Sequence, residues 1–278
     1  MDLSQFISNA LNEDIGDGDH TSLASIPSNN LGKAKIYAKE DGIIAGIELA
    51  GLIFHTLDAD LQVENKVVDG DHANNGDTLM VITGKTQSIL AAERLVLNCM
   101  QRMSAIATLT GSMVKLLNGL PTKILDTRKT TPGFRYLEKW AVRIGGGVNH
   151  RFGLYDVIMI KDNHIDFAGG ISNAITNTME YLRSNNKKLQ ICIEARSLHD
   201  IEEILKVGGI DRIMLDNFTP ELLKEAVTQI DGKYDTEATG GITVDTVRSF
   251  AESGVDYVSI GAITHSAGSM DISLIAIN

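Results

Sequence analysis

Basic side chains cluster between Arg128 and His164 in an otherwise acidic chain. The whole chain has 25 Lys and Arg against 36 Asp and Glu, a formal net charge of −11. Within the segment, three acidic residues face seven basic ones: Arg128, Lys129, Arg135, Lys139, Arg143, Arg151 and Lys161. Positive charge concentrated on a negative background predicts a small anionic ligand bound at one place. A nucleic-acid surface would instead accompany a basic overall balance.

Six short apolar runs after residue 122 each lead into a residue with useful chemistry. The runs are KILDT, DVIMIK, LQICIEA, DRIMLD, YDTEATG and DYVSIG. The residues at their ends follow one another at intervals of 33, 33, 22, 23 and 22: Arg128, Lys161, Glu194, Asp216, Thr239 and Gly261. A step of about 22 residues fits one strand, one helix and two loops. The α/β repeat predicts a (β/α) barrel, and six strands favour a barrel with missing units.

A barrel would gather these side chains, because the carboxyl ends of its strands share one mouth. Guanidinium groups bind planar carboxylates bidentately, and lysines act as point charges for carboxylate or phosphate. The cations expected at the mouth are Arg128, Lys129, His150, Arg151 and Lys161. A solvated role is common for any single surface cation, but five near neighbouring strand ends favour gripping of an anion.

Two carboxylates, Glu194 and Asp216, end the next two strands. They could bind Mg²⁺, steady a cationic centre or accept hydrogen bonds from sugar hydroxyls. Pairing with a nearby arginine is the structural alternative for each.

Small residues end the last two predicted strands. They are Thr239, Gly240 and Gly241 in the first turn, and Ser259, Ile260 and Gly261 in the second. Such turns let backbone N–H groups approach an anion, as in the phosphate sites late in many barrels. A tight turn or a helix cap is the alternative interpretation.

The combination predicts a site for a polyanionic ligand. One part of this ligand carries acidic groups and another part carries phosphate. Phosphoribosyl transfer fits, because its oxocarbenium-like transition state needs carboxylates near the ribosyl centre and cations on the anionic ends. A Schiff-base aldolase using Lys161 and a non-catalytic phosphate-binding module are the alternatives. His164 could contact a ligand or support a neighbour, whereas His20 and His265 are expected to be structural or capping residues.

The chain is expected to form two domains. Residues 1–110 show an amphipathic helix, short β runs and helical periodicity from Ser88 to Leu117, which indicates a small α+β domain. Residues 111–266 form the barrel domain, and the tail, 267–278, is a candidate to pack on the first domain. Cys99 and Cys192 have no partner motif, and no apolar run approaches the ~18 residues of a membrane span. We expect a cytoplasmic protein without a signal peptide, and neither a membrane nor a nucleic-acid partner.

The motifs together resemble the quinolinate phosphoribosyltransferase family. The matching segments include LNEDIGDGDHTS, AERLVLNCMQRMSAIAT, ILDTRKTTPGFR, AVRIGGGVNHRFGL, MIKDNH, ICIEAR, RIMLDNF, EATGGI and VDYVSIGAITHS, in order along nearly the whole chain. The resemblance implies an N-terminal open α/β sandwich domain and an incomplete α/β barrel. It implies transfer of a phosphoribosyl group from phosphoribosyl diphosphate to quinolinate with Mg²⁺, giving nicotinate mononucleotide, CO₂ and diphosphate in NAD biosynthesis. It also implies a homodimer with shared active sites, and leaves open whether dimers form a hexamer.

The resemblance also assigns roles to individual residues. Quinolinate would be bound by Thr127, Arg128, Lys129, His150, Arg151 and Lys161, with Arg94 reaching into the neighbouring subunit's site. Phosphoribosyl diphosphate would be bound by Lys129, Glu194, Asp216, Thr239, Gly240, Gly241, Ser259, Ile260 and Gly261. Catalysis is expected from Lys129, Lys161, Glu194 and Asp216, with the two carboxylates facing Mg²⁺ directly or through substrate or water. Many relatives have ESSGG where this chain has EATGG, and Thr239 keeps the hydroxyl.

One paralogous group competes with this interpretation. ModD-like proteins, associated with molybdenum uptake, resemble the same fold but depart at the KDNH region. Because this chain has both DTRKTTPGFR and IKDNH, the biosynthetic enzyme is the favoured interpretation.

Overall fold

The computed structural model describes residues 2–277, which divide into two compact units. The first unit takes the residues up to Gly111, the segment Thr131–Gly146 and the residues from Ser266 onward. The second unit takes Ser112–Thr130 and Gly147–His265. In the part of the chain that is described, no helix is both long enough and apolar enough to cross a bilayer.

The first unit contains a four-stranded antiparallel sheet in the order β12-β1-β5-β3. Along β1, every second side chain from Ala34 to Ala38 is buried, the period-2 pattern of a strand with one covered face. A separate two-stranded sheet pairs β2 with β4. The strands of this unit are β1 (Leu31–Ala38), β2 (Gly42–Ile43), β3 (Gln62–Asn65), β4 (His72–Ala73), β5 (Thr78–Lys85) and β12 (Ile272–Ile277).

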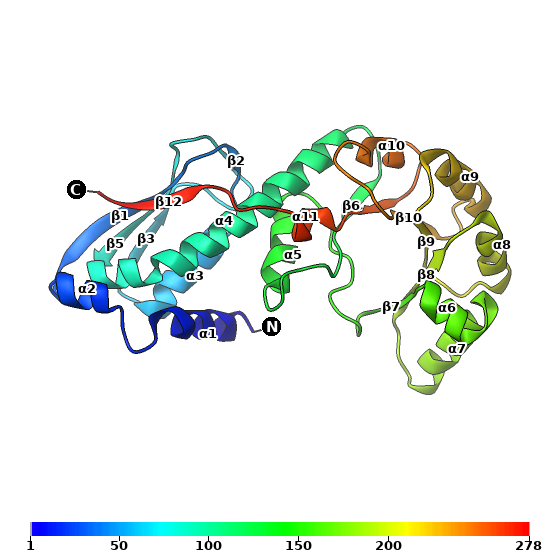
Figure 1. Cartoon of the computed structure of the whole chain (residues 1–278), viewed down its shortest axis with the longest axis horizontal. Coiled ribbons are helices and arrows are strands. Elements are labelled where there is room, and N and C mark those ends of the chain that lie inside the picture. The colour runs from blue at the N-terminus through cyan, green and yellow to red at the C-terminus, as the bar shows by residue number, and fades with distance from the viewer. Residues whose placement is uncertain (1, 278) are drawn as a thin grey trace. The chain divides into compact units, whose positions relative to one another are not determined.

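Five helices accompany these strands: α1 (Leu3–Ile15), α2 (His20–Ser25), α3 (Ile47–Leu57), α4 (Thr86–Leu116) and α5 (Arg135–Ile144). The carboxylates of Asp2 and Asp19 accept hydrogen bonds from the first turns of α1 and α2, which fixes where these helices begin. His20 is the first residue of α2 and contacts Asp17, so it belongs to the capping region. Helix α3 has no counterpart among the predicted elements; its buried face packs in the core beside the sheet (Figure 1).

The C-terminal tail returns to the first unit as a strand. β12 runs antiparallel to β1, with Ala38 opposite Ile272 and Lys33 opposite Ile277 (Figure 1). The side chain of Gln101 donates to the carbonyl of Ile272 over 2.8 Å.

The segment 131–146 departs from the predicted division, which placed it in the barrel domain. Glu138, fully buried on α5, accepts hydrogen bonds from Arg102 of α4 at 2.8 and 3.0 Å. Its other oxygen accepts from the backbone N–H of Thr131 over 3.1 Å. A buried carboxylate is stable only when it is paired, and this pairing holds α5 in the first unit.

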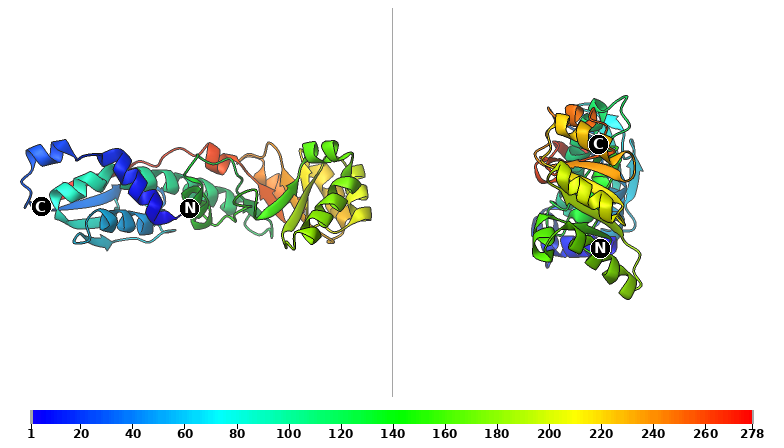
Figure 2. Two further views of the ribbon diagram at one scale, coloured as in Figure 1. Left: turned by 90° about the horizontal axis from the view of Figure 1, so that it is seen from below. Right: turned by 90° about the vertical axis from the view of Figure 1, so that its right-hand side faces the viewer.

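The second unit is a six-stranded, wholly parallel sheet in the order β6-β11-β10-β9-β8-β7. All six predicted strands are present: β6 (Lys123–Leu125), β7 (Val157–Ile160), β8 (Gln190–Ala195), β9 (Arg212–Asp216), β10 (Asp235–Thr239) and β11 (Tyr257–Ser259). The helices of this unit are α6 (Asp162–Ala168), α7 (Ile171–Ser184), α8 (Leu198–Val207), α9 (Pro220–Ile230), α10 (Val247–Ala251) and, after the last strand, α11 (Ala262–His265). Figure 2 shows α6 to α9 layered outside the strands.

The sheet is an open barrel, because β6 and β7 lie at its opposite ends. The expected α/β class and incomplete barrel are therefore confirmed. Outside the six strands, a single parallel bridge joins Val148 to Leu125 of β6.

Candidate active site

A cavity of about 720 Å³ opens at the carboxyl ends of the parallel strands in the second unit. It gathers nearly all of the predicted site residues. They are Thr127, Arg128, Lys129, His150, Arg151, Lys161, Glu194, Asp216, Thr239, Gly240, Gly241, Ser259 and Gly261. Other lining residues did not appear among the sequence candidates: Met159, Met214, Glu237, Ile242, Thr243 and Ala262. His265, expected to be structural, also lines the cavity.

The loop after β6 places Arg128 and Lys129. The hydroxyl of Thr127 accepts a hydrogen bond from the backbone N–H of Lys129 over 3.0 Å, and Thr264 donates to the Lys129 carbonyl over 2.9 Å. Gly261 allows the Lys129 side chain to pass close by, because a Cβ there would lie 3.1 Å from Lys129 Cδ. The backbone of Lys129 is therefore held by its own loop and by α11, and its side chain passes over Gly261.

A buried carboxylate, Asp126, positions the loop that carries His150 and Arg151. Its Oδ1 accepts from the backbone N–H of His150 over 2.8 Å, and its Oδ2 accepts from the Asn149 amide over 2.6 Å. Asp126 is fully buried and bridges two segments 24 residues apart. Sequence reasoning missed this role, although the aspartate stands inside the ILDTRK motif.

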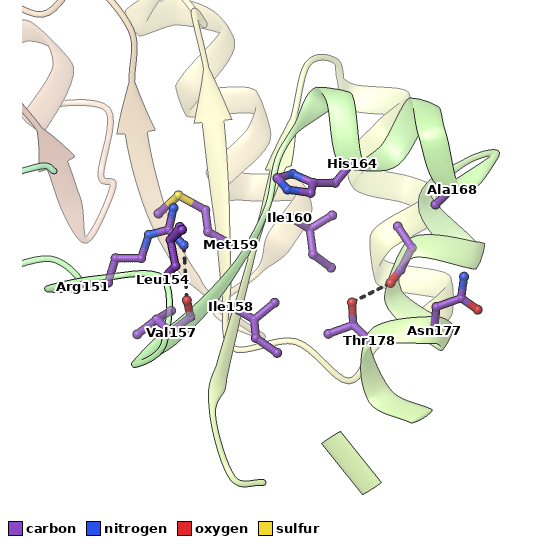
Figure 3. A pocket seen from close by; sticks show the side chains of 11 residues that line it. Arg151, Leu154, Val157, Ile158, Met159, Ile160, His164, Ala168, Asn177 and Thr178 are labelled. Carbon is purple, nitrogen blue, oxygen red and sulfur yellow. Dashed lines mark hydrogen bonds between the residues drawn. The ribbon is translucent and has the colours of Figure 1, made fainter. Parts of the chain in front are cut away.

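Arg151 is partly buried and is braced by its own loop. Its guanidinium donates to the carbonyl of Val157 over 3.3 Å (Figure 3). Burial lowers the pKa of Arg151, and the neighbouring positive charge of Arg128 lowers it further. Two guanidinium groups that repel one another are relieved by a ligand with negative charge, so this side of the cavity suits a carboxylate.

Lys161 and Glu194 form an ion pair across neighbouring strand ends. Glu194 also accepts from the backbone N–H of Asp162 over 3.1 Å, so one carboxylate supports both the lysine and the start of α6. Of the two roles considered for His164, the structure shows the supporting one: its Nδ1 accepts from the backbone N–H of Lys161 over 3.0 Å.

On the other side of the cavity, Asp216 and Thr239 are joined directly. The hydroxyl of Thr239 donates to Asp216 Oδ1 over 2.9 Å, and the Asn217 amide donates to Oδ2 over 2.8 Å. A hydroxyl has one proton to donate. Because Thr239 gives it to Asp216, hydrogen bonds to a phosphate in this turn must come mainly from backbone N–H groups.

The glycines after β10 adopt conformations that other residues avoid. Gly240 has φ +97° and Gly241 has φ +62°, and a Cβ on Gly240 would lie 2.2 Å from Asn217 Oδ1. The backbone is thereby exposed at the cavity, as an anion-binding turn requires.

The cavity floor contains a charged network centred on Glu237, which is fully buried on β10. Arg212 donates to Glu237 Oε2 over 3.0 Å, Ser259 donates to Oε1, and His150 Nε2 lies 3.3 Å from Oε2. Burial alone would raise the pKa of Glu237, but His150, Ser259 and Arg212 together hold it below its ordinary value. Glu237 is therefore an ionised group inside the barrel.

A second, smaller cavity of about 360 Å³ is lined by residues of the outer strand β7, of the loop before it and of helices α6 and α7 (Figure 3). Figure 3 places Arg151 and Met159 on one side of this strand and His164, Asn177 and Thr178 on the other. The space contacts the main site only through Arg151 and Met159, which line both cavities.

Two predicted site residues do not line the main cavity. Arg94 is an exposed residue of α4 in the first unit. Ile260 is 1% exposed, and its backbone N–H donates to the carbonyl of Leu125 over 3.0 Å. That N–H is occupied within the sheet, so Ser259 and Gly261 face the cavity while Ile260 packs in the core.

An open parallel barrel with cations on one side of its mouth and glycine turns on the other defines a class of phosphate-handling barrel enzyme. Comparison with known proteins gives the family. Residues 19–104 match the N-terminal domain of quinolinate phosphoribosyl transferase and residues 106–275 match its C-terminal domain. The chain belongs to this family.

Relatives agree along the full length. The chain is 46% identical over 288 residues to "Quinolinate phosphoribosyltransferase [decarboxylating] 1b" of Nicotiana tabacum, covering 98% of this chain and 82% of that one. It is 41% identical to "Probable nicotinate-nucleotide pyrophosphorylase [carboxylating]" of Bacillus subtilis, covering 99% and 93%. The crystal structure of NadC from Streptococcus pyogenes superposes with a TM-score of 0.93 at 38% identity, covering 99% of this chain and 97% of that chain.

Proposed function

We propose that the protein transfers the phosphoribosyl group of phosphoribosyl diphosphate to quinolinate and removes one carboxylate, giving nicotinate mononucleotide, CO₂ and diphosphate. This is the reaction of the family in NAD biosynthesis. The observation that carries the proposal is a single cavity with a cationic side, a glycine-turn side and two carboxylates between them. The relatives carry the names of the biosynthetic enzyme, which leaves the ModD-like alternative without support.

Quinolinate binds on the cationic side. Its two ring carboxylates are met by the guanidinium groups of Arg128 and Arg151 and by the ammonium groups of Lys129 and Lys161. The ion pair with Glu194 partly offsets the charge of Lys161. Quinolinate therefore competes with Glu194 for this lysine, and binding frees the carboxylate to face the ribosyl group.

Phosphoribosyl diphosphate binds across the carboxylates and the glycine turns. The exposed backbone N–H groups at Gly240 and Gly241 donate hydrogen bonds to the phosphate. Ser259 and Gly261, at the end of the next strand, line the same part of the cavity. Asp216 and Glu194 line the cavity from the neighbouring strands β9 and β8, between the glycine turn after β10 and Lys161 after β7, and would face the positive charge that develops on the ribosyl carbon as the diphosphate leaves.

Mg²⁺ fits this site only together with substrate oxygens. Among residues 2–277, no three His, Cys, Asp or Glu side chains gather as a metal site. Mg²⁺ is commonly held by one or two carboxylates plus substrate phosphates, and Asp216 with Glu194 supplies that number. When bound, the ion would neutralise the departing diphosphate, and Asp216 would hold it directly or through water.

Decarboxylation needs no dedicated base. The pyridine nitrogen forms a bond to the ribosyl carbon as the bond to diphosphate breaks, and the ring nitrogen becomes cationic. The C2–carboxylate bond then breaks, its electron pair remains on C2, and C2 takes up a proton as CO₂ departs. The protein's part is to hold the other carboxylate on the cationic side and to keep the ring in place.

The assembly and location follow as further parts of the proposal. A homodimer would allow Arg94 to complete the site of the neighbouring subunit. A cytoplasmic location suits two buried free cysteines, because thiols remain reduced there.

The decisive experiment is an assay of the purified protein with quinolinate, phosphoribosyl diphosphate and Mg²⁺, following nicotinate mononucleotide and CO₂. Nicotinate serves as the parallel acceptor. Product from quinolinate but not from nicotinate is expected. A folded protein that binds phosphoribosyl diphosphate and yields no product from quinolinate would refute the proposal.

A substitution separates the two sides of the cavity. Arg151→Ala should weaken quinolinate binding by at least about tenfold, since a charge-assisted hydrogen bond is worth roughly 1.5–3 kcal/mol. Binding of phosphoribosyl diphosphate should change much less. Isothermal titration with each substrate measures both, and equal losses would contradict the role given to Arg151.

A further inference from the structure

We propose that Glu237 is a positioning residue that orients the His150 ring, with its proton on Nε2 and Nδ1 turned to the N–H of Arg151, and thereby fixes the main chain of Arg151. The inference deepens the proposed function, on which its kinetic test rests. It assigns His150 a different task from the cationic one expected from the sequence: the ring shapes the quinolinate side of the cavity without adding charge to it.

The two ring nitrogens of His150 face different partners. The backbone N–H of Arg151 donates to Nδ1 over 2.6 Å, so Nδ1 is the unprotonated nitrogen. Nε2 lies 3.3 Å from Glu237 Oε2 and is the position left for the ring proton. An imidazolium would carry a proton on Nδ1 as well, directly opposite the N–H of Arg151 at that short distance.

Glu237 is suited to this task because it is immobile and charged. It is 0% exposed, and the side chain of His150 is only 7% exposed, so water competes weakly for their contact. Arg212 on β9 and Ser259 on β11 donate hydrogen bonds to the Glu237 carboxylate. Arg212 is in turn stacked 4.0 Å from the ring centre of Tyr257, which fixes the far end of the network.

The network links the floor of the barrel to its mouth. From Glu237 the contacts run through His150 to the backbone of Arg151, while Asp126 holds the backbone N–H of His150. Two buried carboxylates thus hold the same residue, one through its ring and one through its backbone. The Arg151 guanidinium starts from a fixed main chain, as a group that must meet a planar carboxylate requires.

The tautomer is tested on the unmodified protein, without turnover. Nitrogen-15 NMR of protein with labelled histidine reports which ring nitrogens of each histidine are protonated, and His150→Asn identifies the resonances of His150. The proposal expects His150 with a protonated Nε2 and a bare Nδ1 at neutral pH. An imidazolium, or a ring with its proton on Nδ1, would overturn it.

The positioning role is tested with Glu237→Gln, against Glu225→Gln as the control. Glu225 is exposed on α9, so its variant has the same change of charge away from the cavity. Glu237→Gln should raise the KM for quinolinate by about tenfold or more, the lower end of the loss found when a group that orients a metal ligand is removed. The KM for phosphoribosyl diphosphate should change much less, and the His150 resonances should shift toward a mixture of tautomers.

The outcomes are separable. An unchanged KM for quinolinate together with an unchanged His150 tautomer in Glu237→Gln would refute the positioning role. If the variant does not fold, the spectrum of the unmodified protein still decides the tautomer. If the unmodified protein shows no activity with quinolinate, the proposed function fails, whereas the tautomer result stands on its own.

Discussion

At the scale of single residues, the carboxylates around the cavity fall into two groups. Asp126 and Glu237 are fully buried and hold other residues in place. Asp216 is only partly buried, and Glu194, although buried itself, lines the cavity and pairs with the half-exposed Lys161, so each has a partner that a ligand can replace. A carboxylate whose partners are all buried groups of the fold is structural, and one that pairs with a cavity residue can act on substrate.

Gly240 gives the sharpest test of the glycine turn. Gly240→Ala should raise the KM for phosphoribosyl diphosphate by at least about tenfold, because a left-handed backbone position with a side chain costs roughly 1–3 kcal/mol and the new Cβ would overlap Asn217. Steady-state kinetics with each substrate varied in turn measures the effect.

Gly232→Ala is the matched control for Gly240→Ala. Gly232 also has a positive φ, of +66°, but nothing lies within 4 Å of its Cβ position, and it is outside the cavity. It should cost some stability and leave both KM values unchanged. If the two variants behaved alike, backbone strain rather than the phosphate turn would explain the loss.

At the scale of elements, the strands were predictable and their supports were not. Six apolar runs at regular intervals predicted the six parallel strands, because a buried parallel strand is a short, continuous run of apolar residues that can be recognised without the rest of the chain. The membership of α5 in the first unit depends on the pair Arg102 and Glu138, which are 36 residues apart. The contact of Arg102 with Glu138 and that of Asp126 with His150 each join residues far apart in the sequence. No local sequence pattern predicts such a contact, so both are known only from the structure.

The loop from Arg151 to Asp156 shows how one carboxylate shapes a site element. Asp156 accepts from the backbone N–H groups of Phe152 and Gly153. Burial raises its pKa, but these hydrogen bonds and Arg151 bring the pKa below its ordinary value. A carboxyl with a lowered folded pKa stabilises the fold above its unfolded value, about 3.9 for Asp, and this stability is lost as the pH falls through the folded value.

Asp156→Asn should therefore destabilise the protein at neutral pH and matter less in acid. The difference in apparent melting temperature between the unmodified protein and Asp156→Asn should shrink as the pH drops below about 4, because Asp156 becomes protonated first in the unfolded state and, at lower pH, in the folded state as well. Circular dichroism melts at a series of pH values measure it. A difference that is constant with pH would mean that the charge of Asp156 contributes nothing to the loop.

At the scale of the whole molecule, the two cysteines report on core integrity. Burial raises the pKa of the Cys99 thiol to about 12, and it raises that of the Cys192 thiol to about 12 as well. A thiol reagent attacks the thiolate, so both should resist reaction at neutral pH in the native protein and react in denaturant. A colorimetric thiol titration counts them. Fast reaction of either cysteine in the native state would contradict its burial.

The last prediction concerns the assembly, because the main cavity is lined by residues of the second unit whereas Arg94 belongs to the first. If Arg94 completes the site of a neighbouring subunit, Arg94→Ala and Lys161→Ala should each abolish most activity. A hybrid dimer of the two variants would then contain one site with both groups intact. Refolding an equal mixture should restore roughly a quarter of the unmodified activity, since about half of the dimers are hybrids with one good site each.

Differently tagged subunits, purified by both tags, separate the hybrid from either parent. No activity in the purified hybrid would mean that Arg94 serves its own chain, and the proposed dimer would then have to rest on other contacts.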